Sequence, residues 1–249
     1  MNLFLKNIFE KKQVEDKNGN LFPMHSNTSS EQCEFLQELI REVKPFSSLE
    51  IGLAYGISAV AILDELKKLN QPFHHTIMDP FQESWNDIGL FNIERAGLSA
   101  NITFHRKFSD QVLPSLYNDN YRIQFAYIDS TKVFDVLMTD VYFINKILDV
   151  NGILVLDDCG FPGIRLLVRF LSQLPGYTIH KIFSKDSYSL KFKFLRNSYL
   201  KALSSLPFRK KVLPGYNFKT DAQLGVNYNC IAFRKVKEDD RNWDWYCSF

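Results

Sequence analysis

The chain has 249 residues, 45% of them hydrophobic and 23% charged, with a formal net charge of +2. This composition excludes a disordered chain and gives no general case for nucleic-acid binding. No apolar run approaches the roughly 20 residues of a membrane span, so we expect no stable membrane insertion. The four cysteines are scattered and form no CxxC pair, which is typical of reduced thiols and predicts a cytoplasmic protein.

Hydrophobic spacing predicts a helix at residues 30–43, after which strands and helices alternate. The expected strands cover residues 48–51, 74–78, 102–105, 125–128, 152–156, 178–183 and 230–234. The expected helices between them cover residues 58–69, 83–96, 109–116, 133–148 and 163–173. Alternation of this kind is the signature of a doubly wound α/β fold, a mostly parallel sheet with crossover helices on both faces. We expect seven strands, the last of them antiparallel.

The chain is expected to form one domain over residues 1–249, with residues 1–45 as a cap segment on the substrate side. Residues 184–229 form a long insertion between the last two strands, and its first half is basic and aromatic. A connection this long is usually functional or partly disordered. This insertion could serve as a lid, a dimer contact or a docking surface, or be a solvated segment without a specific role.

A candidate cofactor loop follows the first strand of the sheet, with glycines at 52 and 56 directly before a helix. Glycine lets the backbone approach a ligand closely, and the free amides of a helix start favour an anion. The spacing is not GxGxxG, because Ala54 takes the middle position, and this argues against a dinucleotide. Asp79 ends the next strand, where a carboxylate accepts both ribose hydroxyls. The alternatives are that the glycine loop is a tight turn without a ligand and that Asp79 is a surface acid in a turn.

Three carboxylates follow two other strands of the sheet. Asp129 comes directly after the strand at 125–128, and Asp157 and Asp158 after the strand at 152–156. Neighbouring parallel strands lie about 5 Å apart, so these strand ends converge. Carboxylates so close repel one another unless a cation intervenes, and hard divalent cations take oxygen ligands. The pattern predicts a magnesium or manganese site; otherwise one acid caps the next helix and another is solvated.

The run LEIGLAYGISAVAILDEL at 49–66 resembles the first motif of class I S-adenosylmethionine-dependent methyltransferases, in particular the catechol O-methyltransferase group. The resemblance covers roughly residues 30–180 and implies their Rossmann-like methyltransferase fold. It implies that Glu50, Gly52 and Ser58 hold the methionine part of S-adenosylmethionine, with Ala54 in the same loop. Asp79 would hold the ribose.

Later segments carry the resemblance further. The run at 108–114 looks like the adenine-side segment, with Ser109 at the contact position. The runs at 128–132 and 156–163 resemble the paired metal motifs of metal-dependent O-methyltransferases, including sugar O-methyltransferases. The resemblance therefore implies Asp129, Asp157 and Asp158 as metal ligands, and we place Asp129 beside the cofactor as well. Asp158 stands where the catechol group has Asn, and position 132 holds Lys where many bacterial relatives have His.

Methyl transfer to a hydroxyl needs a base, and Lys132 follows Asp129 by three residues. We expect burial beside a cation to lower the pKa of Lys132 and make it the base. The alternatives are Asp129 as the base and Lys132 as a solvated residue at a helix start. His25, in the loop before the first predicted helix, is a weak candidate for the substrate site.

The predicted function is S-adenosylmethionine-dependent, divalent-metal-dependent O-methylation of a hydroxyl on a sugar or another small metabolite. The expected partner is this small-molecule acceptor, and the sequence also allows a homodimer. One alternative keeps the cofactor but needs no metal. Another is a non-catalytic cofactor-binding or scaffold protein, and a nicotinamide oxidoreductase is the weakest rival.

Overall fold

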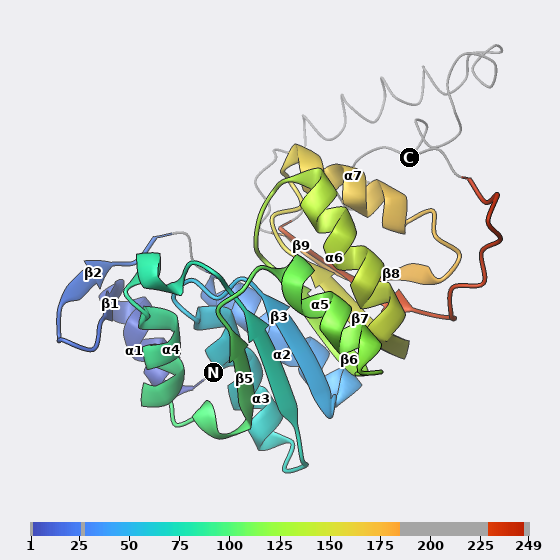
Figure 1. Cartoon of the computed structure of the whole chain (residues 1–249). Coiled ribbons are helices and arrows are strands. Elements are labelled where there is room, and N and C mark those ends of the chain that lie inside the picture. Colours follow the sequence, from blue (N-terminus) through green and yellow to red (C-terminus); the bar gives the residue numbers. More distant parts are fainter. Residues whose placement is uncertain (1, 26–27, 185–228, 247–249) are drawn as a thin grey trace, which may run out of the picture.

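The computed structural model describes residues 2–25, 28–184 and 229–246 (Figure 1). Its centre is a seven-stranded sheet in the order β5-β4-β3-β6-β7-β9-β8. Only β9 runs antiparallel to its neighbours, so the predicted fold is confirmed. The strands are β3 (Ser47–Ile51), β4 (His74–Met78), β5 (Ile102–His105), β6 (Ile123–Ile128), β7 (Leu148–Leu156), β8 (Tyr177–Phe183) and β9 (Cys230–Lys235).

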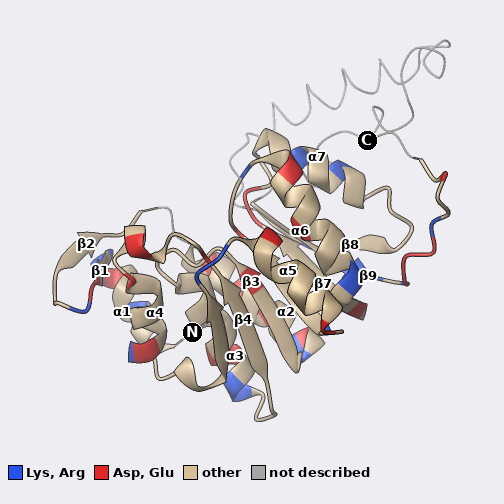
Figure 2. Cartoon of the chain, viewed as in Figure 1, with Lys and Arg blue, Asp and Glu red and all other residues tan. Residues whose placement is uncertain are grey.

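Helices cover both faces of this sheet, as Figure 1 shows. One layer contains α2 (Ser30–Val43), α3 (Ile57–Lys68) and α4 (Ile88–Arg95), and the other contains α5 (Ser109–Asn118), α6 (Phe134–Ile147) and α7 (Pro162–Leu171). Strand β6 serves both layers, because successive side chains of a strand point to opposite faces. Phe125 and Tyr127 pack into the α2–α3 core, and Ala126 and Ile128 into the α5–α7 core. In Figure 2 most of the visible sheet carries no charge, and charged residues lie mainly on helices and loops.

The N-terminal residues form regular structure that no sequence period indicated. Helix α1 (Leu3–Lys11) buries Leu5 and Ile8 in the α2–α3 core. A hairpin of β1 (Gln13–Glu15) and β2 (Leu21–Pro23) follows, and its turn is closed by the Asp16 carboxylate, which accepts the amides of Asn18 and Asn20. With nine residues, α1 is too short for its two buried positions to stand out as a period.

The single helix expected at 83–96 is wrong, because the structure breaks it in two. A 3-10 helix, η1 (Gln82–Trp85), is followed by α4, and Asn86 and Asp87 between them are left-handed, with φ of 52° and 54°. Asn and Asp tolerate this conformation better than other residues with a Cβ. The break brings Gly89 against the cofactor loop, where a Cβ on Gly89 would lie 2.5 Å from the carbonyl oxygen of Ala54.

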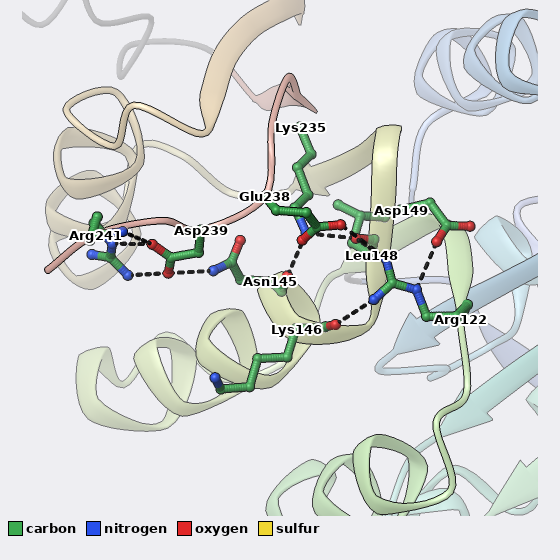
Figure 3. Close-up of polar contacts among 9 residues, drawn as sticks. All are labelled: Arg122, Asn145, Lys146, Leu148, Asp149, Lys235, Glu238, Asp239 and Arg241. Atoms are coloured by element: carbon green, nitrogen blue, oxygen red, sulfur yellow. Dashed lines mark hydrogen bonds and ion pairs between the residues drawn. The ribbon is translucent and has the colours of Figure 1, made fainter.

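A polar cluster fastens the end of β9 to the α6–β7 connection (Figure 3). Lys235 is fully buried, and its Nζ donates to the carbonyl oxygens of Asn145 and Leu148 at 2.8 Å each and to Glu238 at 2.6 Å. Arg122 joins the cluster through Asp149 and Glu238. A buried ammonium is stable only with such a set of partners, so this cluster fixes the position of the last strand.

The described residues leave part of the predicted organisation untested. Residues 185–228, which make up nearly all of the expected insertion, lie outside them, as does Cys247; the other three cysteines are buried free thiols. Within the described ranges, no helix is long and apolar enough to cross a membrane.

We predict that Lys235→Met lowers the free energy of unfolding by about 2–4 kcal/mol, because two buried carbonyl oxygens lose their charged donor. Lys237→Met is the matched control, since Lys237 is exposed and its partner among the described residues is the exposed Asp240. The control is expected to change stability by less than about 0.5 kcal/mol. Urea unfolding of both variants measures this, and equal losses would contradict the assigned role of Lys235.

Candidate active site

A cavity of about 490 Å³ opens where β3, β4 and β6 end. Strand ends are where open α/β sheets bind ligands. Every predicted cofactor residue except Glu50 lines it, and aromatic side chains complete the wall. The lining includes Gly52, Ala54, Tyr55, Ser58, Asp79, Phe81, Trp85, Phe108, Ser109 and Asp129.

Gly52 sits where only glycine fits. Its φ is +95°, and a Cβ there would lie 2.0 Å from the carbonyl oxygen of Asp129. The amide of Asp129 in turn donates to the carbonyl oxygen of Ile51 at 3.0 Å. The close approach at Gly52 therefore holds the end of β6, and with it Asp129, against the cofactor loop.

Glu50 lies behind the cavity wall. It is fully buried and accepts a hydrogen bond from the Ser58 hydroxyl. Its other oxygen lies 3.3 Å from Nε2 of His75, whose Nδ1 is 2.8 Å from the Ser48 hydroxyl. This buried network fixes the orientation of Ser58, which does line the cavity. The structure thus gives Glu50 a supporting position, and its predicted contact with the cofactor stays a prediction.

Asp79 organises the cofactor loop. Its Oδ2 accepts the amides of Leu53 and Ala54 at 2.9 and 3.0 Å, together with Nε2 of Gln82 at 3.0 Å. Among the residues that the structure describes, its Oδ1 accepts from the Phe81 amide alone, at 2.8 Å. A carboxylate has about four acceptor positions, so Oδ1 is the oxygen with capacity for a further donor such as a ribose hydroxyl.

Asp157 points into the protein interior. Its Oδ2 accepts from the Tyr127 hydroxyl at 2.6 Å and from Nε2 of Gln32 at 2.5 Å. Its Oδ1 accepts from the Asp158 amide at 2.7 Å and from Sγ of Cys230 at 3.1 Å. Burial raises the pKa of the Cys230 thiol well above its usual range, so the thiol keeps its proton and donates it. Four donors therefore satisfy this carboxylate.

Asp129 and Asp158 are joined by Lys132. The Nζ of Lys132 lies 3.2 Å from Oδ1 of Asp129 and 2.7 Å from Oδ2 of Asp158. Burial lowers the pKa of Lys132, but the negative charges of Asp129 and Asp158 outweigh it, and the pKa is raised above its usual value. The downward shift was expected beside a bound cation; with only the two acids as neighbours, the pKa of Lys132 moves upward. Lys132 stays an ammonium and is outside the residues that line the cavity, which argues against its predicted role as the base.

Asp129 is the one member of this group in the cavity wall. Burial raises the pKa of Asp129 to about 7, the charge of Asp157 adds to the rise, and Lys132 offsets part of it. Its carboxylate is held through one oxygen by Lys132. Asp129 therefore remains available as a proton acceptor at the cavity.

The arrangement does not fit the predicted three-carboxylate metal site. Among the residues described, no three His, Cys, Asp or Glu side chains are grouped so that they could hold a metal ion. The oxygens of Asp157 are committed to internal donors, and an ammonium already lies between the other two acids. Convergence of strand ends brings the backbones together but does not fix the directions of the side chains.

Sequence reasoning missed Gln32. This residue shares the apolar face of α2 with Phe35, Leu36 and Leu39, and it is buried. A buried polar side chain on an apolar face needs a partner, and that pattern could have indicated the contact with Asp157. His25, the weak substrate-site candidate, lies beside the cavity, with Nε2 3.0 Å from the Tyr55 hydroxyl and its ring 5.7 Å from that of Trp85.

Comparison with known proteins finds similarity to methyltransferases. Residues 49–159 match the family described as "Methyltransferase domain". This stretch, which runs from β3 to the end of β7, is therefore similar to a methyltransferase domain. Over 148 residues it is 27% identical to a caffeoyl-CoA O-methyltransferase-like protein of Arabidopsis thaliana, a match that covers 59% of this chain and 60% of that relative. The chain thus spans about three fifths of the length of the curated relative that it matches.

Solved structures share the methyltransferase fold. An O-methyltransferase from Bacillus cereus in complex with S-adenosylhomocysteine has a TM-score of 0.62 at 16% identity, over 95% of this chain and 92% of that one. The O-methyltransferase TomG from Streptomyces achromogenes, in complex with S-adenosylmethionine, has a TM-score of 0.60 at 13% identity, over 95% and 90%. At these identities the likeness concerns the fold alone.

Asp140 on α6 is a buried acid beneath the segment at residues 108–114. It is fully buried, and by geometry neither carboxylate oxygen has a hydrogen-bond partner among the described residues. Burial raises the pKa of Asp140 to about 6, and the nearby Ser109 hydroxyl offsets part of the rise. An acid with a raised folded pKa stabilises the fold at low pH, and this contribution is lost as the pH rises through about 6.

We therefore expect Asp140→Asn to stabilise the fold at pH 8, by up to about 3 kcal/mol, because the ionised carboxylate is removed. Near pH 4, where Asp140 is neutral in the folded protein, the two proteins should differ little. Thermal or urea unfolding at both pH values measures the difference. Asp135→Asn, on the exposed side of α6, should change stability by about 0.5 kcal/mol or less at either pH. A loss of stability at pH 8 in Asp140→Asn would contradict the account.

Proposed function

We propose that this protein is an S-adenosylmethionine-dependent O-methyltransferase that acts on a hydroxyl of a small-molecule acceptor. The observation that carries the proposal is the cavity in which Gly52, Asp79, Ser109 and Asp129 meet at the strand ends. Its support from outside the chain is the methyltransferase family match, together with two fold neighbours that were solved with S-adenosylmethionine or S-adenosylhomocysteine.

The residues present suit this cofactor. The loop from Gly52 to Ser58 offers a close backbone approach for the methionine part, and Oδ1 of Asp79 has acceptor capacity for a ribose hydroxyl. Phe81 and Phe108 are 55% and 52% exposed and meet edge to face at 5.6 Å in the cavity wall. A flat, partly apolar ligand would cover these rings. When bound, the cofactor supplies an activated methyl group on a sulfonium.

The protein's own contribution is positioning and proton transfer. We assign Asp129 as the group that receives the acceptor's proton, because it is the carboxylate in the cavity wall. Lys132 holds one oxygen of Asp129 in place. Since the carboxylates do not fit a metal centre, we favour transfer without a divalent metal over the metal-dependent reaction predicted from the sequence. The acceptor hydroxyl belongs to a sugar or, as the name of the plant relative suggests, to the phenolic group of a thioester such as caffeoyl-CoA.

The test combines calorimetry with S-adenosylhomocysteine and methyl transfer from labelled S-adenosylmethionine to a panel of sugars and phenols, with and without chelator. Asp79→Asn should weaken binding by about 1–3 kcal/mol. The neutral side chain of the variant carries no negative charge to accept the hydrogen bonds from the Leu53 and Ala54 amides. Asp129→Asn should keep the affinity but lower kcat by roughly 10²–10⁴-fold, the usual contribution of a general base.

Asp119→Asn is the control, since Asp119 is exposed at the far end of α5 and should behave as wild type. No binding of either cofactor form by the folded wild type would refute the proposal. Binding without turnover across the whole panel would favour the non-catalytic reading. Turnover that stops in chelator and returns with magnesium would restore the metal-dependent one.

A further inference from the structure

The two outward-facing acids at the ends of β6 and β7 already share a cation. Asp129 and Asp158 both reach one atom, the Nζ of Lys132, at 3.2 and 2.7 Å. The three side chains are 28–41% exposed, so the group is partly buried but still open to ions from solution. One ammonium between two carboxylates leaves a charge of −1, where the acids alone would carry −2.

The backbone of Lys132 is held as firmly as its side chain. Gly163, at the start of α7, packs against it so closely that a Cβ on Gly163 would lie 2.3 Å from the carbonyl oxygen of Lys132. On the other side, Gly52 makes the same kind of approach to Asp129. The backbone at Asp129 and Lys132 is thus held by the loop after β3 on one side and by the start of α7 on the other. This position directs the Lys132 ammonium to the two acids.

Asp157, the third acid, is not free to bind a metal ion. Asp157 has four internal donors, and a metal ion would have to displace the hydroxyl of Tyr127 and the amide of Gln32 from a buried position. Breaking buried, charge-assisted hydrogen bonds is costly unless new partners replace them. Any divalent ion at this edge would therefore depend on Asp129 and Asp158, and would compete directly with Lys132.

We propose that Lys132 is the resident cation of the Asp129–Asp158 pair and keeps divalent metal ions out of it, so that a neutral residue at position 132 opens a divalent-metal site. The two freed carboxylates and bound waters supply the oxygen ligands that magnesium and manganese use. This inference concerns cation binding and stands independently of the proposed methyl transfer.

The experiment is a titration with Mn²⁺ alone, followed by calorimetry and by the electron paramagnetic resonance signal of free Mn²⁺. Wild type should bind with a Kd of about 1 mM or weaker, and Lys132→Met at least about tenfold more tightly. Lys132→Arg keeps the charge and should behave as wild type. Adding Asp158→Asn to Lys132→Met should abolish the gain.

Lys68→Met is the matched control, because Lys68 also bridges two acids, Asp64 at 2.6 Å and Glu65 at 3.4 Å, away from the site, but Glu65 keeps a second cation, Arg41 at 3.1 Å, when Lys68 is replaced. It should bind Mn²⁺ as weakly as wild type. Circular dichroism checks each variant, and Lys132→Gln replaces Lys132→Met if the latter does not fold. Wild type that binds Mn²⁺ as tightly as the neutral variant would overturn the proposal, and so would a neutral variant that binds no better than wild type.

Discussion

Charge balance at the ends of β6 and β7 is the constraint on which the rest of the site depends. Three carboxylates lie at the ends of these two paired strands, and the protein compensates their charge in two ways. Four neutral donors satisfy Asp157 in the interior, whereas Lys132 bridges Asp129 and Asp158. Without these partners the acids would repel one another across adjacent strands. With them, one carboxylate, Asp129, is free to face the cavity.

The cavity itself depends on backbone contacts more than on charge. Gly52 packs against the Asp129 carbonyl, Gly89 against that of Ala54, and Gly163 against that of Lys132. Each contact leaves no room for a Cβ, so these glycines draw the segments after β3, β4, β6 and β7 toward one another. Asp79 adds hydrogen bonds to the amides of the first loop. The loop is therefore held in shape by the protein itself, which reduces the ordering that a ligand must supply.

Much of this could be predicted from the sequence because it follows from repeating patterns. Every strand of the main sheet was predicted within a few residues, and Gly52, Asp79, Ser109 and Asp129 meet at one cavity. What failed depends on single residues. The break at Asn86 and Asp87 arises from two left-handed residues inside an apolar period, and α1 is too short to show one. Helix period and strand order carry no information on such local conformations.

The directions of side chains also could not be predicted from the sequence. Strand-end convergence correctly brought the three acids together, but it could not tell that Asp157 turns inward toward Gln32, 125 positions earlier in the chain. The surroundings of Lys132 were unpredictable for the same reason, because strand order does not tell that its ammonium lies between the carboxylates of Asp129 and Asp158.

The most direct test of this account is a crystal structure grown with S-adenosylhomocysteine and MnCl₂, with data collected at the manganese absorption edge. We predict the ligand in the cavity along Gly52, Asp79 and Ser109, with Lys132 bridging Asp129 and Asp158 and no anomalous peak beside them. An anomalous peak coordinated by Asp129, Asp157 and Asp158, with Lys132 turned away, would contradict the account.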